Sequence, residues 1–303
     1  DLTSDQILNY NGGFEGLEQS MHYDSVAAHS SYSREAHSYQ YGKPAIRGEV
    51  GFAWYAQRFS NPYKGIWFTY EDQLLIDDTD GIWWKKWIWA NTDSGGLIEI
   101  YWGGAPLVDP NFGGRFPKYG RAFLNFMSDI PLSNGKYKDV AAQVSNPTLR
   151  VLGQKDLTNN KAHIWIDNAP YTWKAVVDHN FNPSNIAWNK SVTYANNSIA
   201  SDPANINQVY QSLQGNNKNH TLTDGAWWKI LGADWYKLLD MKELNPPLPA
   251  PVNGIVTIPG LADGTYNIEW WDTSTGIITS TETKQSGSGN LTLSVNNLVS
   301  DIA

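Results

Sequence analysis

The chain has 303 residues, of which 41% are hydrophobic and only 17% are charged, so it is long enough for two folded domains and its composition excludes a disordered protein. The net charge of −8, without any basic run, argues against nucleic acids and anionic membranes as partners. The absence of cysteine excludes disulfide bonds, zinc–thiolate sites and cysteine nucleophiles. The sequence contains no run of about 18 apolar residues, so no membrane span is predicted.

The unusual feature of the composition is its aromatic content of 13%, with 15 Trp and 16 Tyr. Such an excess is typical of proteins that stack flat rings on carbohydrate, and also of aromatic-rich sandwich cores. Low charge and many Asn, Ser, Thr, Gly and Trp residues favour a secreted or cell-surface protein of bacterial type. The chain does not begin with Met and shows no signal peptide, so a mature, a processed and a partial chain all remain open.

Residues 1–128 are predicted to alternate strands and helices. We expect a short helix within 1–10, with Thr3 or Ser4 as its N-cap. The further elements, in chain order, are a strand at 21–29, a strand at 45–47, a helix at 80–90, a strand within 95–104 and a helix at 119–127. Strands that alternate with helices predict parallel βα units, in which strand ends carry the site. Three strands are too few to close a barrel of eight.

Residues 129–303 show a different pattern, with alternating apolar and polar positions between turn residues. The predicted strands are 149–152, 161–167, 254–258, 265–271, 277–282 and 291–295. Turns are expected at 263–264, 275–276 and 286–289. This part is predicted to be an antiparallel β-sandwich.

A segment at about 178–251 interrupts the predicted sandwich. Helical spacing predicts helices at 203–213 and 227–239, the second with a row of Trp and Leu side chains along one face. Proline-rich residues 246–251 form a stiff linker back into the sandwich. We interpret the segment as a helical insertion whose Trp row packs on the domain, with a sugar platform as the alternative.

The most informative candidate site is Glu49, which follows the short strand at 45–47 and lies between Gly48 and Gly51. Pro44 suits the first position of a strand, and the two glycines allow a bend or a close approach beside the carboxylate. A carboxylate at the carboxyl end of a barrel strand, followed by aromatic residues, is how a nucleophile is presented to a sugar. The alternative is a surface Glu in a turn.

Several stretches resemble the C-terminal portion of a (β/α)8 retaining glycoside hydrolase, of the cellulase-like members of clan A that carry a C-terminal β-sandwich. These stretches are 24–32, 43–51, 87–102, 123–132, 162–173 and 264–276. The resemblance implies a partial barrel over residues 1–128 and a β-sandwich over 129–303. The insertion at about 178–251 is not typical of the family.

The resemblance also implies roles for individual residues. Glu49 corresponds to the nucleophile, His29 and Tyr32 to side chains of the preceding strand that face the cleft, and Trp102 to the ring under the cleaved sugar. From its position we add Trp54 as a wall of an outer subsite. Each of these side chains also has a plain structural alternative, as a strand-end or core residue.

The second carboxyl group of a retaining pair, about 5–5.5 Å from the nucleophile, is not identified. The family places its acid/base Glu after an Asn, and the chain contains no Asn-Glu dipeptide. Glu99 is a weak candidate, because a carboxylate inside a strand more often pairs with Arg or Lys. The six His show no ligand spacing, so neither a metal nor another cofactor is predicted.

Three functional hypotheses remain from the sequence. The first is a retaining β-glycosidase acting on a β-glucan, mannan or xylan, in which this chain supplies the nucleophile half. The second is a non-catalytic carbohydrate-binding or assembly protein derived from such an enzyme. In the third, another copy of the chain, or the N-terminal half of the barrel, supplies the remaining strands.

Overall fold

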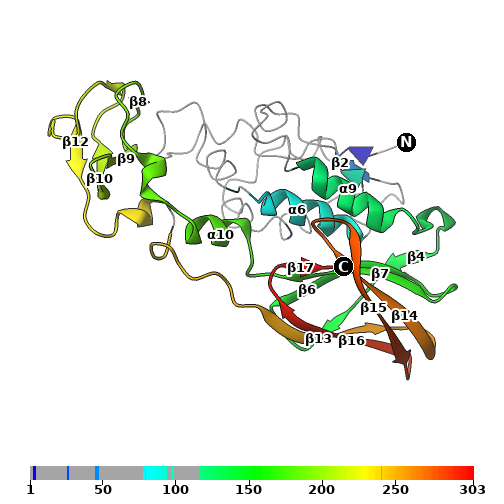
Figure 1. Ribbon diagram of the computed structural model, residues 1–303. Coiled ribbons are helices and arrows are strands. Elements are labelled where there is room, and N and C mark those ends of the chain that lie inside the picture. Colours follow the sequence, from blue (N-terminus) through cyan, green and yellow to red (C-terminus); the bar gives the residue numbers. More distant parts are fainter. Residues whose placement is uncertain are drawn as a thin grey trace. The chain divides into compact units, whose positions relative to one another are not determined.

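The computed structural model describes residues 3–4, 26, 45–47, 78, 80–93, 97–98, 116–239 and 241–303 (Figure 1). These residues fall into two compact units. Unit 1 contains the described residues up to 47 and those within 80–173 and 249–303, and most of unit 2 is residues 174–248. The fold is mixed α/β with mostly antiparallel sheets. The predicted domain limits, 128/129 and 178–251, stay predictions.

The N-terminal part contributes a small parallel sheet. Its strands are β1 (Thr3–Ser4), β2 (Ala45–Arg47) and β3 (Leu97–Ile98), in that order. Both pairings are parallel, with Thr3 opposite Ala45 and Ile46 opposite Leu97. The strands predicted at 45–47 and within 95–104 are therefore confirmed.

Two N-terminal predictions are wrong. Thr3 and Ser4 form a strand instead of starting a helix, because the β-branched Thr suits a strand as well as a cap. Val26 is helical and buried, although residues 21–29 were predicted as a strand. The two alanines that follow Val26 in the sequence have the highest helix propensity, and the alternation there is weak.

Both helices predicted in the Trp-rich part are confirmed. They are α6 (Ile82–Trp89), followed by the 3₁₀ turn η2 (Ala90–Thr92), and α9 (Phe116–Met127). Every residue of α6 is buried, including Lys85 and Lys86. Asn91 closes the end of α6, where its amide donates to the carbonyl oxygens of Trp87 and Ile88, both at 2.9 Å.

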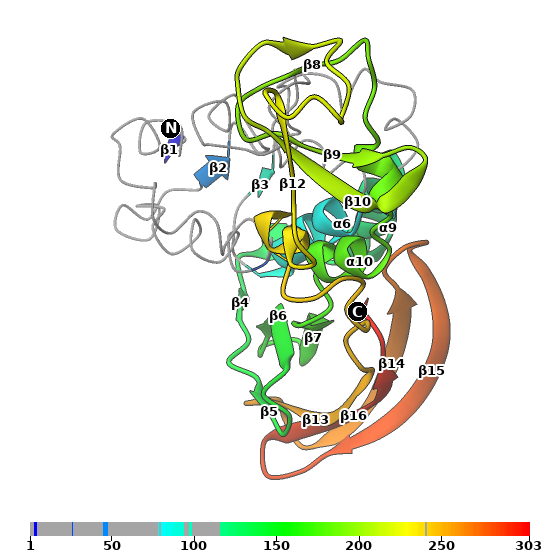
Figure 2. The same cartoon turned by 90° about the vertical axis from the view of Figure 1, so that its left-hand side faces the viewer.

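The rest of unit 1 is antiparallel (Figure 2). One sheet runs β17-β7-β6-β4, with β4 (Tyr137–Asp139), β6 (Leu149–Asp156), β7 (Lys161–Asn168) and β17 (Asp301–Ile302). A second runs β16-β13-β5, with β5 (Gln143–Val144), β13 (Val252–Pro259) and β16 (Asn290–Leu298). The long hairpin is β14 (Gly264–Asp272) and β15 (Ile277–Ser286), and η3 (Leu132–Asn134) precedes β4. All six strands predicted here are confirmed.

Strand β7 is covered on both faces because its side chains alternate. Ile164 and Ile166 join a core that also contains Val256 of β13 and Leu293 of β16, so the two sheets share one core. Trp165 points the other way and packs with residues of α6 and α9 in a second core. Figure 1 shows these helices on one side of β6 and β7, and β13 and β16 on the other.

Unit 2 overturns the predicted helical insertion. Its elements are α10 (Trp173–His179, which begins at the boundary), η4 (Pro183–Ile186), β8 (Thr193–Tyr194), β9 (Ile199–Asp202), β10 (Asn205–Ser212), β11 (Asn217–Lys218), β12 (Trp228–Ile230) and η5 (Trp235–Leu239). The two predicted helices are instead β10, and β12 followed by a 3₁₀ turn. Within the described residues, no helix is long and apolar enough to span a membrane.

Local hydrogen bonds explain why the first of these segments is a strand. Asp202 accepts the backbone N–H of Ala204 at 2.8 Å, which makes Pro203 and Ala204 the tip of a β9–β10 hairpin. Pro203 therefore lies in a turn and does not begin a helix. In the second segment, Gly232 separates β12 from η5, and Trp228 and Trp235 are buried in different cores of the unit.

Candidate functional site

All five residues predicted for the sugar site lie outside the described residues. They are Glu49, His29, Tyr32, Trp54 and Trp102. Glu99 lies outside them as well. The structure does describe strand β2, which precedes Glu49, and strand β3, which precedes Glu99 and Trp102. The geometry of these two strands is what bears on the site.

Strands β2 and β3 are parallel neighbours, with Ile46 opposite Leu97 and Arg47 opposite Ile98. Their carboxyl ends therefore lie at the same edge of the sheet. Residue 49 follows the end of β2 by two positions, and residue 99 follows β3 directly. By contrast, the helical Val26 does not support the strand on which the roles of His29 and Tyr32 depend.

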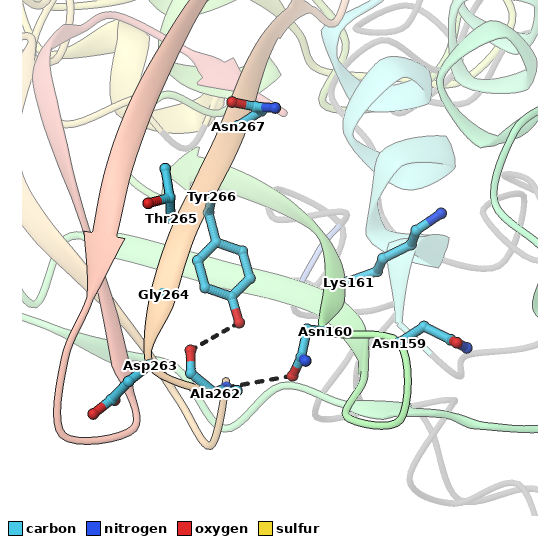
Figure 3. A pocket seen from close by; sticks show the side chains of 9 residues that line it. All are labelled: Asn159, Asn160, Lys161, Ala262, Asp263, Gly264, Thr265, Tyr266 and Asn267. Atoms are coloured by element: carbon cyan, nitrogen blue, oxygen red, sulfur yellow. Dashed lines mark hydrogen bonds between the residues drawn. The ribbon is translucent and has the colours of Figure 1, made fainter.

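Unit 1 contains an open polar pocket of about 350 Å³ that was not predicted (Figure 3). It lies between the β6–β7 turn and the start of β14. The lining residues are Asn159, Asn160, Lys161, Ala262, Asp263, Gly264, Thr265, Tyr266 and Asn267. All of them except the half-buried Tyr266 are exposed.

Ala262 joins the two sides of this pocket. Its backbone N–H donates to Asn160 Oδ1 at 3.4 Å, and its carbonyl oxygen accepts the Tyr266 hydroxyl at 2.9 Å (Figure 3). Asp263 Oδ1 in turn accepts the N–H of Gly289 at 2.8 Å. The walls are therefore held in place without any ligand.

The buried carboxylate of Asp156 fixes the other wall. It accepts Asn159 Nδ2 at 2.6 Å and the N–H of Thr158 at 2.8 Å, and Asn134 Nδ2 donates to it at 3.0 Å. Burial raises the pKa of this carboxyl, but these hydrogen bonds outweigh burial and lower its pKa. Asp156 is thus an ionised anchor for the Asn159–Asn160 turn.

A second group of buried charges lies between α6 and the β17-β7-β6-β4 sheet. Asp167 binds Lys86 at 2.6 Å and Arg150 at 2.5 Å, and Asp301 binds Lys85 at 2.6 Å. Trp165 Nε1 also donates to Asp301 Oδ2 at 2.9 Å. Burial raises the pKa of Asp301, but the positive charges of Lys85 and Lys86 outweigh it and lower the pKa. Because the side chains of both carboxylates are fully buried and paired, the cluster joins a helix to a sheet and offers no carboxylate to a substrate.

His163 is a buried neutral imidazole in the same region. Its Nε2–H donates to the carbonyl oxygen of Thr92 at 3.1 Å, so the other ring nitrogen, Nδ1, carries no proton. Desolvation lowers its pKa from 6.5 to about 4. The rings of Tyr137 and Phe126 lie 5.2 and 6.4 Å from the imidazole. His163 is therefore a core residue.

The described residues of unit 2 include a semi-exposed aromatic stack. The ring of His220 lies 3.8 Å from that of Trp227, nearly parallel, and His220 Nδ1 is 3.3 Å from Asp224 Oδ2. The predicted Trp row is thus divided, since Trp228 and Trp235 are core residues and only Trp227 stacks at the surface.

Sequence reasoning missed the pocket although its turn signals were visible. The Asp263-Gly264 pair was read only as a turn, and Asn159-Asn160 separates two strands. Nothing in the sequence places these turns beside each other. Within the described ranges, no group of three or more acidic or His side chains is arranged to hold a metal ion.

No family model, no curated protein and no solved structure matches this chain.

Proposed function

We propose that this chain is a carbohydrate-active protein, a retaining β-glycoside hydrolase in which Glu49 is the nucleophile. The observation that carries the proposal is the parallel pairing of β2 with β3. Parallel strands bring the segments that follow them to one edge of the sheet, which is where α/β enzymes hold their catalytic groups. Residues 49 and 99–102 follow these two strands.

The rest of unit 1 is compatible with this class of enzyme. We interpret β1, β2 and β3 as strands of a (β/α)8 barrel and the two antiparallel sheets as a β-sandwich. The core shared by Leu149, Ile166, Val256 and Leu293 supports the second interpretation. A secreted or cell-surface location and a β-glucan, mannan or xylan substrate belong to the same proposal.

In the retaining mechanism, the Glu49 carboxylate attacks the anomeric carbon and the glycosidic bond breaks. A second carboxyl group protonates the leaving oxygen and then removes a proton from the water that hydrolyses the glycosyl-enzyme. Glu99, which follows the neighbouring strand directly, is our candidate for this group. Trp102 is the proposed ring under the sugar.

The test compares Glu49→Ala with Glu243→Ala, which changes an exposed Glu of unit 2. We expect Glu49→Ala to lose at least about 10³-fold in turnover of β-glucan, mannan or xylan, and azide to restore part of it as an external nucleophile. Glu243→Ala should keep wild-type turnover. Equal turnover by wild type and Glu49→Ala would remove Glu49 from the mechanism.

A second candidate function is carbohydrate binding without hydrolysis, which the polar pocket of unit 1 favours. It predicts that the wild-type protein binds one of the three glycans but releases no reducing ends from any of them. A measurement of reducing ends over a day therefore separates the two functions.

A further inference from the structure

We propose that the pocket between the β6–β7 turn and the start of β14 is a binding site for a neutral glycan, separate from the proposed catalytic edge of β2 and β3. The inference rests on the proposed carbohydrate function for the identity of its ligand. The pocket itself is described in full, since all nine lining residues belong to the described part of unit 1 (Figure 3).

The pocket is preorganised. Asn160 has a left-handed backbone, with φ of 52°, and its side-chain oxygen is already engaged by Ala262. Tyr266 is tied to the same residue. Because neither side chain must be ordered on binding, little conformational entropy is lost when a ligand enters.

Hydrogen-bonding capacity remains after these internal contacts. With Oδ1 of Asn160 engaged, its amide nitrogen still has two protons to donate. The side chains of Asn267 and Lys161 are exposed, and neither makes a hydrogen bond with another described residue. The pocket lining thus combines several donors and acceptors with the half-buried ring of Tyr266, which suits the hydroxyl groups and C–H faces of a sugar.

The charge of the lining selects a neutral ligand. Lys161 and Asp263 are the only charged residues among the nine, and their charges are opposite. An anion such as a phosphate would face Asp263 without a cluster of basic groups. An uncharged polyhydroxyl chain meets no such penalty.

The pocket also lies at an open strand edge. β14 pairs with β15 on one side. On its other side the backbone of Trp271 exchanges hydrogen bonds with Ala303, at 2.7 and 3.3 Å. At Gly264–Asn267 no other described strand pairs with this edge. Backbone groups of this edge therefore add donors and acceptors to the site.

The test measures binding of β-1,4-linked glucohexaose, mannohexaose and xylohexaose by calorimetry, in the full chain carrying Glu49→Ala. Two pocket variants are compared: Asn160→Asp, which replaces the amide donors by an acceptor, and Asn267→Ala. The matched control is Asn216→Asp, because Asn216 is also exposed and left-handed, with φ of 58°, but lies in unit 2.

We expect at least one hexaose to bind, and the pocket variants to weaken its affinity about 5- to 10-fold while Asn216→Asp leaves it unchanged. Equal affinities in pocket and control variants, or no binding of any hexaose, would overturn the proposal. Hydrolysis is measured separately. If Glu49→Ala is fully active, Glu49 is not the nucleophile. The difference in hexaose affinity between Asn160→Asp and Asn216→Asp still tests whether the pocket binds the glycan.

Discussion

Lys86 of α6 and Asp167 of β7 form an ion pair that is almost completely withdrawn from solvent. The ammonium nitrogen lies 2.6 Å from Asp167 Oδ1, with side-chain exposures of 2% and 0%. Lys86 also donates to the carbonyl oxygen of Asn168 at 3.1 Å. A buried pair of this kind adds little net stability, but the loss of one partner removes a compensating charge from the other. The pair therefore fixes how α6 lies on the sheet.

Replacement of Lys86 by Met should destabilise the protein by about 1–3 kcal/mol, because the buried Asp167 would lose one of its two charged partners and keep only Arg150. The free energy of unfolding is measured with urea. The control is Lys237→Met, which removes an ion pair with Asp234 whose partners are 59% and 68% exposed. This control should change stability very little. Similar losses in both variants would show that burial of the pair is unimportant.

His163 should make unit 1 less stable in mild acid. Its pKa is about 4 in the folded protein and about 6.5 when unfolded, so the unfolded chain binds more protons between these values. Stability contributed by the neutral ring is complete above about pH 6.5 and falls as the pH drops toward 4. Between pH 7.5 and 4.5 this one group should cost about 2–3 kcal/mol.

The check is urea unfolding of wild type and His163→Gln at both pH values. Gln retains a donor for the carbonyl oxygen of Thr92 but does not titrate. The variant should therefore lose less stability than wild type between pH 7.5 and 4.5. Parallel pH profiles for the two proteins would rule out this role of His163.

Gly276 should be irreplaceable, because it lies against α9 in a left-handed conformation. Its φ is 66°, and a Cβ added there would lie 2.5 Å from the α-carbon of Ala122. Gly289 has a similar φ of 73°, but its nearest neighbour would be 3.9 Å away. Gly289→Ala should therefore cost about 1 kcal/mol from backbone strain alone, and Gly276→Ala about 1–3 kcal/mol more from overlap.

Thermal unfolding of both variants measures this difference. The comparison isolates the contact between the β14–β15 turn and α9, because backbone strain is common to the two sites. If Gly276→Ala and Gly289→Ala melt at the same temperature, the close approach of Gly276 to Ala122 does not occur in solution.

The strands of unit 1 were predictable because their alternation reflects burial. In β7 the sequence places Ile164 and Ile166 on one face and Trp165 on the other, and the structure buries both faces. Strand order is not encoded locally, so the pocket beside Asn160 and Tyr266 could not be found. Long-range partners likewise decide the burial of Lys86, which helical spacing alone would place with solvated charges.

In unit 2, turn residues and β-branched residues favour strands where the spacing of apolar residues predicts a helix. The spacing of Val209 and Leu213 fits a helix, but the Asp202 turn and the β-branched residues of β10 favour a hairpin. Trp227 and Trp228 are adjacent in sequence and have different roles, one stacked on His220 and one buried. The predicted helix assigns both to one apolar face and so does not separate these roles.

Excision of residues 181–244 should leave unit 1 folded. The two ends of this segment lie side by side. His179 Nδ1 is 2.8 Å from the carbonyl oxygen of Pro246, and Asn245 Nδ2 donates to the carbonyl oxygen of His179 at 2.9 Å. Among the described residues, the two hydrophobic clusters of unit 2 lie wholly within this segment, from Phe181 to Met241. Its removal therefore leaves no half of either core exposed.

The shortened protein, closed by a short Gly-Ser link, should unfold cooperatively and retain the difference in stability between wild type and Lys86→Met. That difference reports on the α6–β7 ion pair, which belongs to unit 1. The matched control is a deletion of residues 195–244. It keeps Phe181 and Ile186 but removes their core partners Val209 and Trp235. It should expose apolar surface and aggregate. Loss of cooperative unfolding in the first deletion would show that residues 181–244 are required for unit 1 to fold.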